Sequence, residues 1–274
     1  MGKTIQLSKE QIKLVIEKYK DNWTQKAIGE LIGVSRSVIK RVLLENEIDL
    51  RTTTKKYSSN DDIFEVIDTT EKAYWLGFIA ADGCNYARKH NASLIINIHQ
   101  KDREHLIKFQ EFMNTTAVIQ DYIAFEGYSN QTPMSKIVIN SKKLSQDLSD
   151  KGIVPNKSLV LKPPKISVEF YKPYILGYFD GDGSIGKSSQ YNNYLFSIQG
   201  TRETLNWINE VLNTDMKLEQ RTKNSSKNSY YIRCGGTNKP YNILKSLYDS
   251  SKIHLDRKYE IYKTLETVVL NRNI

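Results

Sequence analysis

Two stretches, Trp75-Leu76-Gly77-Phe78-Ile79-Ala80-Ala81-Asp82-Gly83 and Ile175-Leu176-Gly177-Tyr178-Phe179-Asp180-Gly181-Asp182-Gly183, repeat one pattern at an offset of 100 residues. Each is apolar on nearly all sides and ends in a carboxylate followed by a glycine. This pattern predicts a buried helix that carries one acid at its C-terminal end. Two such helices predict a pseudo-two-fold pair.

Other polar residues recur at nearly the same offset. Gln100 aligns with Gln199, and Lys157 in the turn that begins with Pro155 aligns with Lys258. Two long copies indicate duplicated domains, because stacked repeats are shorter and more numerous. Any one of these residues taken singly would be an ordinary surface residue, but their repetition gives each half an Asp, a Gln and a Lys.

These residues resemble those of the LAGLIDADG homing endonucleases, in the single-chain form with two motif copies, over roughly residues 70–270. The resemblance implies an α+β fold of two αββαββα-type halves, whose saddle-like antiparallel sheets lie along the major groove of DNA. Ala80 departs from the first acid of the motif, whereas Asp180 keeps it. The second acid is the catalytic one in the family, so the departure leaves the predicted catalysis intact.

The resemblance also implies a chemistry. Two carboxylates forced together at helix C-termini raise each other's pKa, and a divalent cation with hard oxygen ligands resolves this conflict. We therefore expect a monomeric endonuclease that uses Mg²⁺, or Mn²⁺ in its place, to cut both strands of a long asymmetric DNA site across the minor groove and to leave short 3′ overhangs. The expected catalytic residues are Asp82, Asp182, Gln100, Gln199, Lys157 and Lys258, and the expected metal ligands are Asp82, Asp182 and the carbonyls of Ala81 and Gly181.

After the first motif the periodicity becomes alternating, which predicts a strand with an apolar face and a polar face. Further strands are expected at 117–126, 134–140, 190–199, 215–223 and 229–234, with helices at 102–113, 141–151, 168–182, 202–213, 239–249 and 256–269. Tyr194 and Phe196 fall where polar readout is expected, which a bulge, contacts with thymine methyl groups or a different register would explain. The candidate DNA contacts on the strands are Ser93, Asn97, His99, Lys217, Glu219, Arg221, Tyr231 and Arg233.

The N-terminal 47 residues predict three helices, at about 8–19, 24–32 and 36–45. Gly33 suits a tight turn, and the small Ala27 is expected where the third helix approaches the second. The pattern is similar to that of bacterial helix-turn-helix regulators, in which the start of the last helix enters the major groove. The candidate DNA contacts of this unit are Ser35, Arg36, Ser37 and Lys40.

These patterns divide the chain into a helix-turn-helix domain at 1–47, a linker at 48–70, a first half at 71–165 and a second half at 166–274. The linker is polar and basic apart from a short apolar stretch, 63–67, which is expected to pack on the second domain. A binding module on a tether raises the effective concentration of its partner module on the same DNA.

Composition agrees with a DNA-binding protein. The net charge of +9 and the pI near 9.2 suit a polyanionic partner. Cys84 and Cys234 give neither a zinc site nor a disulfide framework, and the first residues lack an apolar signal segment. We therefore expect a cytoplasmic protein of a bacterial or phage-infected cell, with no membrane partner.

One alternative remains open: a protein with this fold that binds DNA as a transcription regulator, or RNA as a splicing maturase, without cutting DNA. Retention of both acids, both glutamines and both lysines favours the nuclease, because binding alone does not require paired carboxylates. The sequence ends in Asn273-Ile274 without the junction residues of an intein. An intron-associated or phage-type mobile enzyme is therefore expected.

Overall fold

The computed structural model describes residues 6–272 except 22, 49, 51–56, 89–90, 127–129, 189–192 and 221–227. It divides the chain into two compact units, Met1–Lys55 and Lys56–Ile274. Each unit has its own hydrophobic core. None of the helices that the structure describes is both long and apolar enough to cross a membrane.

The N-terminal unit consists of α1 (Lys9–Lys20), α2 (Gln25–Ile32) and α3 (Arg36–Glu45). Ser8 caps α1 in a capping box with Gln11, and the Thr24 hydroxyl caps α2. Gly33 ends α2 with a φ of 73°, the left-handed conformation that glycine adopts most easily. The core residues of this unit are Val15, Tyr19, Ile28, Ile39, Val42 and Leu43.

The chain that leads into α3 approaches α2 most closely at Gly29, not at Ala27 as the sequence predicted. A Cβ on Gly29 would lie 2.5 Å from the carbonyl oxygen of Val34, whereas Ala27 is only half-buried. Ser35, the residue before α3, makes no side-chain cap bond to the helix, and its hydroxyl hydrogen bonds Ser37 Oγ at 2.7 Å instead. The turn between α2 and α3 therefore depends on two glycines: Gly29 leaves room for the Val34 carbonyl, and Gly33 adopts the positive φ.

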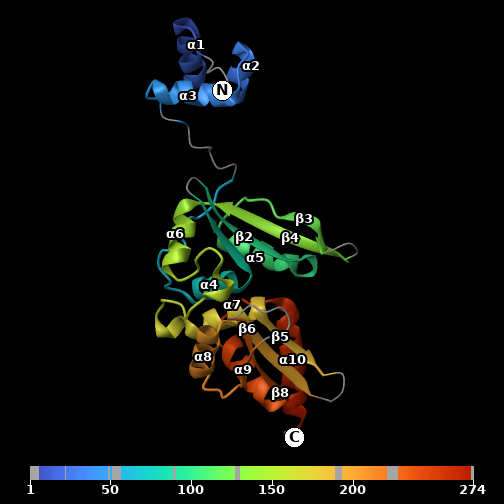
Figure 1. The fold of residues 1–274 in the computed structure, drawn as a ribbon. Coiled ribbons are helices and arrows are strands. Elements are labelled where there is room, and N and C mark those ends of the chain that lie inside the picture. The colour runs from blue at the N-terminus through green and yellow to red at the C-terminus, as the bar shows by residue number, and fades with distance from the viewer. Residues whose placement is uncertain are drawn as a thin grey trace. The chain divides into compact units, whose positions relative to one another are not determined.

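The second unit repeats one order of elements twice, and the predicted α+β class with two αββαββα-type halves is confirmed (Figure 1). The first half contains α4 (Thr70–Asp82), β1 (Gly83–Ala87), β2 (Ala92–His99), η1 (Gln100–Asp102), α5 (Arg103–Phe112), β3 (Gln120–Glu126), β4 (Asn130–Asn140), α6 (Lys142–Asp150) and η2 (Lys157–Leu159). The second half contains η3 (Val168–Phe170), α7 (Tyr171–Asp182), β5 (Gly183–Lys187), β6 (Tyr194–Gly200), α8 (Arg202–Val211), β7 (Leu218–Gln220), β8 (Tyr230–Gly236), α9 (Asn238–Tyr248) and α10 (Asp256–Arg272).

Each half forms a four-stranded antiparallel sheet, in the order β1-β2-β4-β3 and β5-β6-β8-β7. The short strands β1 and β5, which start at the glycine after each motif, were not expected from the sequence. Neither glycine is a left-handed helix cap: Gly83 has a φ of −76° and Gly183 a φ of −95°. Glycine is needed here for space, because a Cβ would lie 2.6 Å from Ile79 Cγ2 at Gly83 and 2.1 Å from Phe179 Cδ2 at Gly183.

The apolar stretch before α4 belongs to the core of this unit. Phe64 is fully buried, and Ile63 and Ile67 are nearly so, as the sequence predicted. The chain is fixed to the first sheet still earlier, where the backbone amide of Asn140 donates to the hydroxyl of Tyr57.

The helices α4 and α7 lie between the two sheets and cross in close contact (Figure 1). A Cβ on Gly77 would lie 1.9 Å from the carbonyl oxygen of Tyr174, and a Cβ on Gly177 would lie 1.9 Å from that of Tyr74. The two contacts are related by the pseudo-two-fold axis that the repeated motif predicts. The absence of both side chains lets backbone meet backbone, at the close end of helix packing.

Replacing Gly77 by alanine should therefore destabilise the second unit by about 3 kcal/mol or more, because the new methyl group meets rigid backbone rather than a movable side chain. Urea unfolding followed by near-ultraviolet circular dichroism measures the change. Gly186→Ala is the matched control, since a Cβ there meets nothing within 4 Å. Equal stability of the two variants would show that the crossing does not need the glycine.

Candidate active site

The two motif helices end side by side, with Asp82 as the last residue of α4 and Asp182 as the last residue of α7. A Cβ on Gly181 would lie 3.3 Å from Asp82 Oδ2, so the Asp82 carboxylate reaches the end of the opposite helix. Burial, followed by the charge of Asp182, raises the pKa of Asp82 to about 7. Burial also raises the pKa of Asp182. The predicted crowding of two acids is therefore present.

A buried lysine lies behind each helix end. Lys157 Nζ donates to the carbonyls of Ala81 at 3.0 Å and Gly83 at 2.6 Å. An ammonium group at a helix C-terminus interacts favourably with the helix dipole. Both lysine charges also lower the pKa of Asp82, opposing the larger effect of burial. The Ala81 carbonyl, predicted as a metal ligand, thus already accepts a hydrogen bond.

Lys258 repeats this arrangement in the second half. Its Nζ donates to the carbonyls of Phe179 at 2.6 Å, Asp180 at 2.9 Å and Gly183 at 2.6 Å. Gly181, the other predicted carbonyl ligand, is not among these acceptors. Burial lowers the pKa of Lys258 to about 8 and also lowers the pKa of Lys157. The lysines therefore act from behind the helix ends rather than from the open face.

The register of the sheets contradicts the expected equivalence of Gln100 and Gln199. The glycine that starts β1 pairs with Ile96, and the glycine that starts β5 pairs with Ile198. The next residue along each strand, Asn97 or Gln199, is exposed on the face opposite the core. Asn97 therefore occupies the position that the sequence assigned to Gln100.

Gln100 itself lies in η1, beyond the end of the strand. Its side chain hydrogen bonds the carboxylate of Asp121, which also accepts from the buried hydroxyl of Ser135 at 2.6 Å. Ser135 lies on the core side of the sheet, so Gln100 is turned away from the open face. The structure therefore places Gln100 against Asp121, and Asn97 holds the strand position equivalent to that of Gln199.

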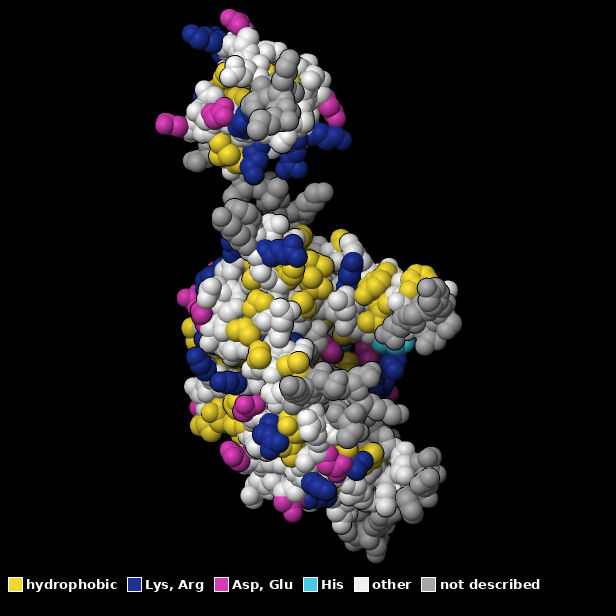
Figure 2. Space-filling model, in the orientation of Figure 1, with side chains coloured by type: hydrophobic (Ala, Val, Ile, Leu, Met, Phe, Trp, Pro, Cys, Tyr) yellow, Lys and Arg dark blue, Asp and Glu magenta, His cyan; other side chains and the backbone are white. Residues whose placement is uncertain are grey.

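A hollow of about 250 Å³ lies beside Asp82 and is lined by residues of both halves. It is lined on the first-half side by Asn97, His99 and Asp102, and on the second-half side by Asp180 and Arg257. Figure 2 shows acidic side chains in the hollow region between the two halves, with basic and histidine side chains beside them. The Asp82 carboxyl group thus opens toward this hollow between the two halves.

The predicted strand contacts of the first half are unequally available. Asn97 is exposed and accepts a hydrogen bond from the Tyr122 hydroxyl at 3.3 Å. His99 is half-buried, and its Nδ1 accepts from the amide of Lys101. Ser93 is only 8% exposed, so little of its side chain can meet a ligand in this structure.

In the second half, Tyr231 and Arg233 share the open face of β8 and both hydrogen bond Glu219 of β7. Lys217 is exposed just before β7, and Arg221 lies outside the described residues. Tyr194 and Phe196 are buried on the core face. The strands of the two halves are offset by 102 residues rather than by the 99 that relates Gln100 to Gln199, and this odd difference reverses the expected faces of the strand. The open face of β6 carries Leu195, Ser197 and Gln199.

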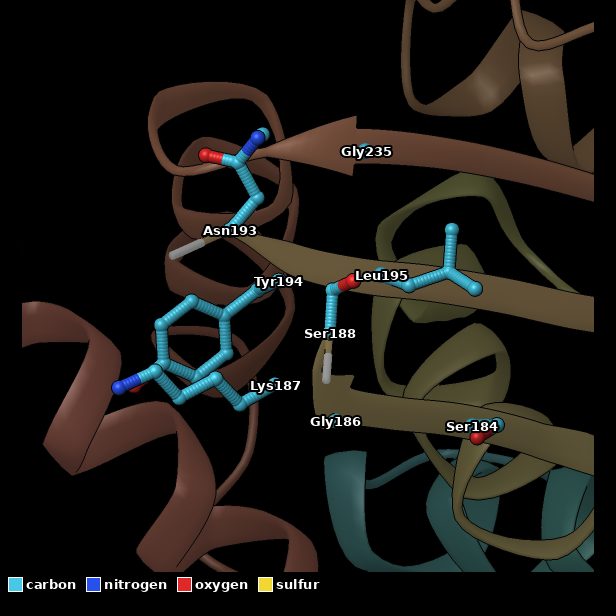
Figure 3. A pocket seen from close by; sticks show the side chains of 9 residues that line it. Ser184, Gly186, Lys187, Ser188, Asn193, Tyr194, Leu195 and Gly235 are labelled. Carbon is cyan, nitrogen blue, oxygen red and sulfur yellow. The ribbon is translucent and has the colours of Figure 1, made fainter. Parts of the chain in front are cut away.

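The far end of the second sheet is hollowed where the first sheet carries side chains. Gly186 and Gly235 line a hollow of about 650 Å³ together with Ser184 and Leu195 (Figure 3). Gly186 occupies the position of Tyr86 in the first sheet, as the strand pairing shows. Lys187 and Tyr194, which are paired where β5 ends and β6 begins, also line it, and their side chains overlap in Figure 3. The two open faces therefore differ in shape.

The candidate contacts of the N-terminal unit, Ser35, Arg36, Ser37 and Lys40, are all exposed at the start of α3. Arg36 Nε donates to Gln25 Oε1 at 3.3 Å, which holds the start of α3 against the start of α2. Among the residues described, no group of three or more His, Cys, Asp or Glu side chains could bind a metal ion.

In metal-free buffer, Asp82→Asn should raise the free energy of unfolding at pH 8 by an amount of order 1–4 kcal/mol. The folded carboxyl has a pKa of about 7, above the ordinary value of 3.8, so its ionisation destabilises the fold above pH 7 and not below about pH 4. Urea titrations at pH 5 and pH 8 measure the difference, with the exposed Asp150→Asn as control. A gain that is the same at both pH values would contradict the raised pKa.

Comparison with solved structures identifies the fold, although no protein-family model and no curated protein sequence matches the chain. The meganuclease I-SmaMI bound to uncleaveable DNA is 14% identical, and the alignment covers 72% of this chain and 89% of that one at a TM-score of 0.50. The LAGLIDADG homing endonuclease I-LtrWI bound to target DNA is 12% identical over 77% and 92%, with a TM-score of 0.46. I-GzeII, a LAGLIDADG homing endonuclease in complex with its DNA target, is 12% identical. That alignment covers 72% of this chain and 89% of the other at a TM-score of 0.47.

At this identity the likeness concerns the fold. The duplicated motif, the close crossing of α4 and α7 and the two four-stranded sheets agree with it. The second unit of the chain has the two-half fold of the single-chain LAGLIDADG homing endonucleases.

Proposed function

We propose that the protein is a metal-dependent DNA endonuclease that cuts both strands of a long asymmetric site. The observation that carries the proposal is the pair of carboxylates, Asp82 and Asp182, at adjacent helix ends, each backed by a buried lysine. A purely structural role does not account for acids placed where each disfavours ionisation of the other. The DNA complexes of I-SmaMI, I-LtrWI and I-GzeII support DNA as the partner.

The donor atoms fit a hard divalent cation. Asp82 and Asp182 supply carboxylate oxygens at a place where added positive charge would relieve their raised pKa values. Because the described residues supply no third acidic or imidazole ligand, the remaining ligands would be water, DNA phosphate or backbone carbonyl, a set typical of Mg²⁺. When bound, the cation would supply charge neutralisation at the phosphate and activation of water. Mn²⁺ has the same preference for oxygen.

The side chains of this chain divide the remaining tasks. The amides of Gln199 and Asn97 lie on the open faces, where they can orient water through hydrogen bonds. Lys157 and Lys258 bind backbone carbonyls at the ends of α4 and α7, so they hold Asp82 and Asp182 in place. Their positive charges would also stabilise negative charge that develops on the phosphate during cleavage. Asn97 replaces Gln100 in this scheme.

The two sheets would follow the major groove on either side of the cut, with the acids facing the minor groove between them. Such a cut leaves short 3′ overhangs. Because both halves belong to one chain, a monomer carries both centres, and its unlike faces suit a non-palindromic site. The exposed Arg36 and Lys40 of the N-terminal unit would add a second contact with the same DNA.

With Mg²⁺, the purified protein should linearise a plasmid that carries the DNA flanking its own gene. Asp82→Asn and Asp182→Asn should each reduce double-strand cleavage by at least about 100-fold, because each acid serves chiefly one strand. Gel analysis of supercoiled, nicked and linear forms measures both cuts, with chelator as the metal control and Asp150→Asn as the protein control. Binding of the same DNA by the two variants should persist in a gel-shift assay.

Two outcomes would overturn this proposal. Full cutting by either aspartate variant would contradict the assigned site. Specific binding of the locus without cutting by the wild-type protein would favour a DNA-binding regulator, and preferential binding of intron RNA would favour a splicing maturase.

Deletion of residues 1–55 should lower DNA affinity by at least about tenfold and reduce its salt dependence, while cleavage at saturating DNA stays unchanged. This end point spares Tyr57 and Ser58, which contact the first sheet and the segment after α5. Arg36→Ala with Lys40→Ala should reproduce much of the loss. Lys13→Ala with Lys20→Ala removes equal charge from exposed positions on α1 and is the control. Unchanged affinity of the deleted protein would exclude a DNA contact by this unit.

A further inference from the structure

The start of α10 is fixed by a carboxylate of α7, the motif helix of the same half. The Leu255 carbonyl accepts from the amides of Lys258 and Tyr259, so Leu255 caps the first turn of the helix. The Leu255 amide in turn donates to Asp180 Oδ2 at 2.8 Å. Asp180 is 2% exposed, so this hydrogen bond is protected from water. The turn from which Lys258 extends is therefore anchored to α7.

Asp180 and Lys258 are also joined directly. The backbone carbonyl of Asp180 accepts from Lys258 Nζ at 2.9 Å, while the Asp180 side chain holds the amide three residues before that lysine. Asp180 thus binds the Lys258 side chain at its ammonium group, through its carbonyl, and the backbone turn from which that side chain extends, through its carboxylate. Loss of the carboxylate acceptor would release the turn before Lys258 and leave the Leu255 amide without a hydrogen-bond partner.

The first half supports the same carboxylate. The Tyr74 hydroxyl of α4 donates to Asp180 Oδ2 at 2.6 Å, and its oxygen lies 3.0 Å from Nε2 of the buried His105. Because the hydroxyl proton points to Asp180, His105 donates from Nε2 and its Nδ1 is the unprotonated nitrogen. His105 Nδ1 has no hydrogen-bond partner, which agrees with a neutral ring. A chain of hydrogen bonds therefore runs from α5 through α4 to α7 and α10.

Ion pairs reinforce this contact at the rim of the hollow beside Asp82. Arg257 makes two hydrogen bonds to Asp102 of the first half, at 3.1 and 3.0 Å, and Lys108 of α5 bonds Asp256 at 2.6 Å. Lys108, Asp256 and Arg257 retain substantial exposure, and pairs of this kind contribute little to stability. The buried acceptor Asp180 is therefore the decisive element.

The other lysine is placed by different means. Ala80 stands at the position that corresponds to Asp180 and has no side-chain acceptor. Lys157 follows Asn156, whose φ of 58° turns the chain into η2, and its Nζ binds two helix-end carbonyls rather than three. The two halves thus share the lysine and the glycine carbonyl that it binds, at Gly83 and Gly183, but differ in what orients the lysine.

We propose that Asp180 is a positioning residue for Lys258, and that loss of its acceptor oxygen impairs one of the two catalytic centres and spares the other. The consequence for cleavage rests on the proposed function, whereas the positioning itself does not. Asp180→Ala tests it, since alanine is the residue that the first half carries at position 80. Asp180→Asn is the matched variant, because one amide oxygen can accept both bonds now made to Oδ2.

The first measurement needs no DNA. Acetylation of lysines in the folded full-length protein, quantified by mass spectrometry, should show Lys258 modified about fivefold faster in Asp180→Ala, which corresponds to about 1 kcal/mol of lost protection. Lys157, which is also buried, in the other half, should be unchanged, and Asp180→Asn should restore protection of Lys258. Equal acceleration at both lysines would indicate general loosening and would overturn the proposal.

The second measurement follows the two strands separately. On plasmid carrying the flanking DNA, with each strand labelled, Asp180→Ala should slow one cut by at least about tenfold and leave the other near the wild-type rate, so that nicked DNA accumulates. Asp180→Asn should cut both strands. Equal slowing of both strands would contradict the proposal, whereas absence of cutting by the wild-type protein would contradict the nuclease function and leave the acetylation result to decide the positioning.

Ser145→Ala is the control for the loss of a buried hydrogen bond elsewhere, since Ser145 Oγ donates to Asn85 at 2.6 Å within the first half. It should change neither the ratio of the two lysine modification rates nor the ratio of the two strand rates. If Asp180→Ala does not fold, Asp180→Ser repeats the test, because its shorter side chain cannot reach the Leu255 amide. An unchanged Lys258 in both variants would end the proposal.

Discussion

The second unit depends on the contact between the backbones of α4 and α7 at Gly77 and Gly177. Because each glycine faces a carbonyl of the other helix, the helices cross without intervening side chains, and their C-terminal ends meet. This meeting brings Asp82 and Asp182 together and requires a cation at each helix end, which the buried lysines provide. Close packing at one point thus creates the electrostatic strain that gives the site its chemistry.

The sequence was sufficient for the features that duplication repeats. The motif helices, the crossing glycines and the lysine pair could be predicted because each recurs at an offset of nearly 100 residues, and the structure brings all of them together. The apolar stretch 63–67 could also be assigned to the core from its composition alone. These features depend on local pattern and require no knowledge of register.

The sequence did not predict features that depend on strand register or on which residues of distant segments come into contact. The strands of the two halves are offset by 102 residues at Ile96 and Ile198, whereas the following helices are offset by 99, because η1 is inserted in the first half only. Alignment of Gln100 with Gln199 follows the offset of the helices, whereas the offset of the strands aligns Asn97 with Gln199. Likewise, nothing local distinguishes Gly29 from Ala27, since only the path of the chain at Val34 shows which residue must lack a side chain.

The two sheets are separate, since each completes its own hydrogen-bonded ladder of four strands. A substitution on one open face therefore leaves the backbone ladder of the other untouched, and changes on distant faces should combine additively. Gly186 in place of Tyr86 shows that the halves have already diverged in this way. Duplication within one chain thus allows each half of a binding surface to be altered independently, a freedom that a symmetric dimer of identical subunits does not have.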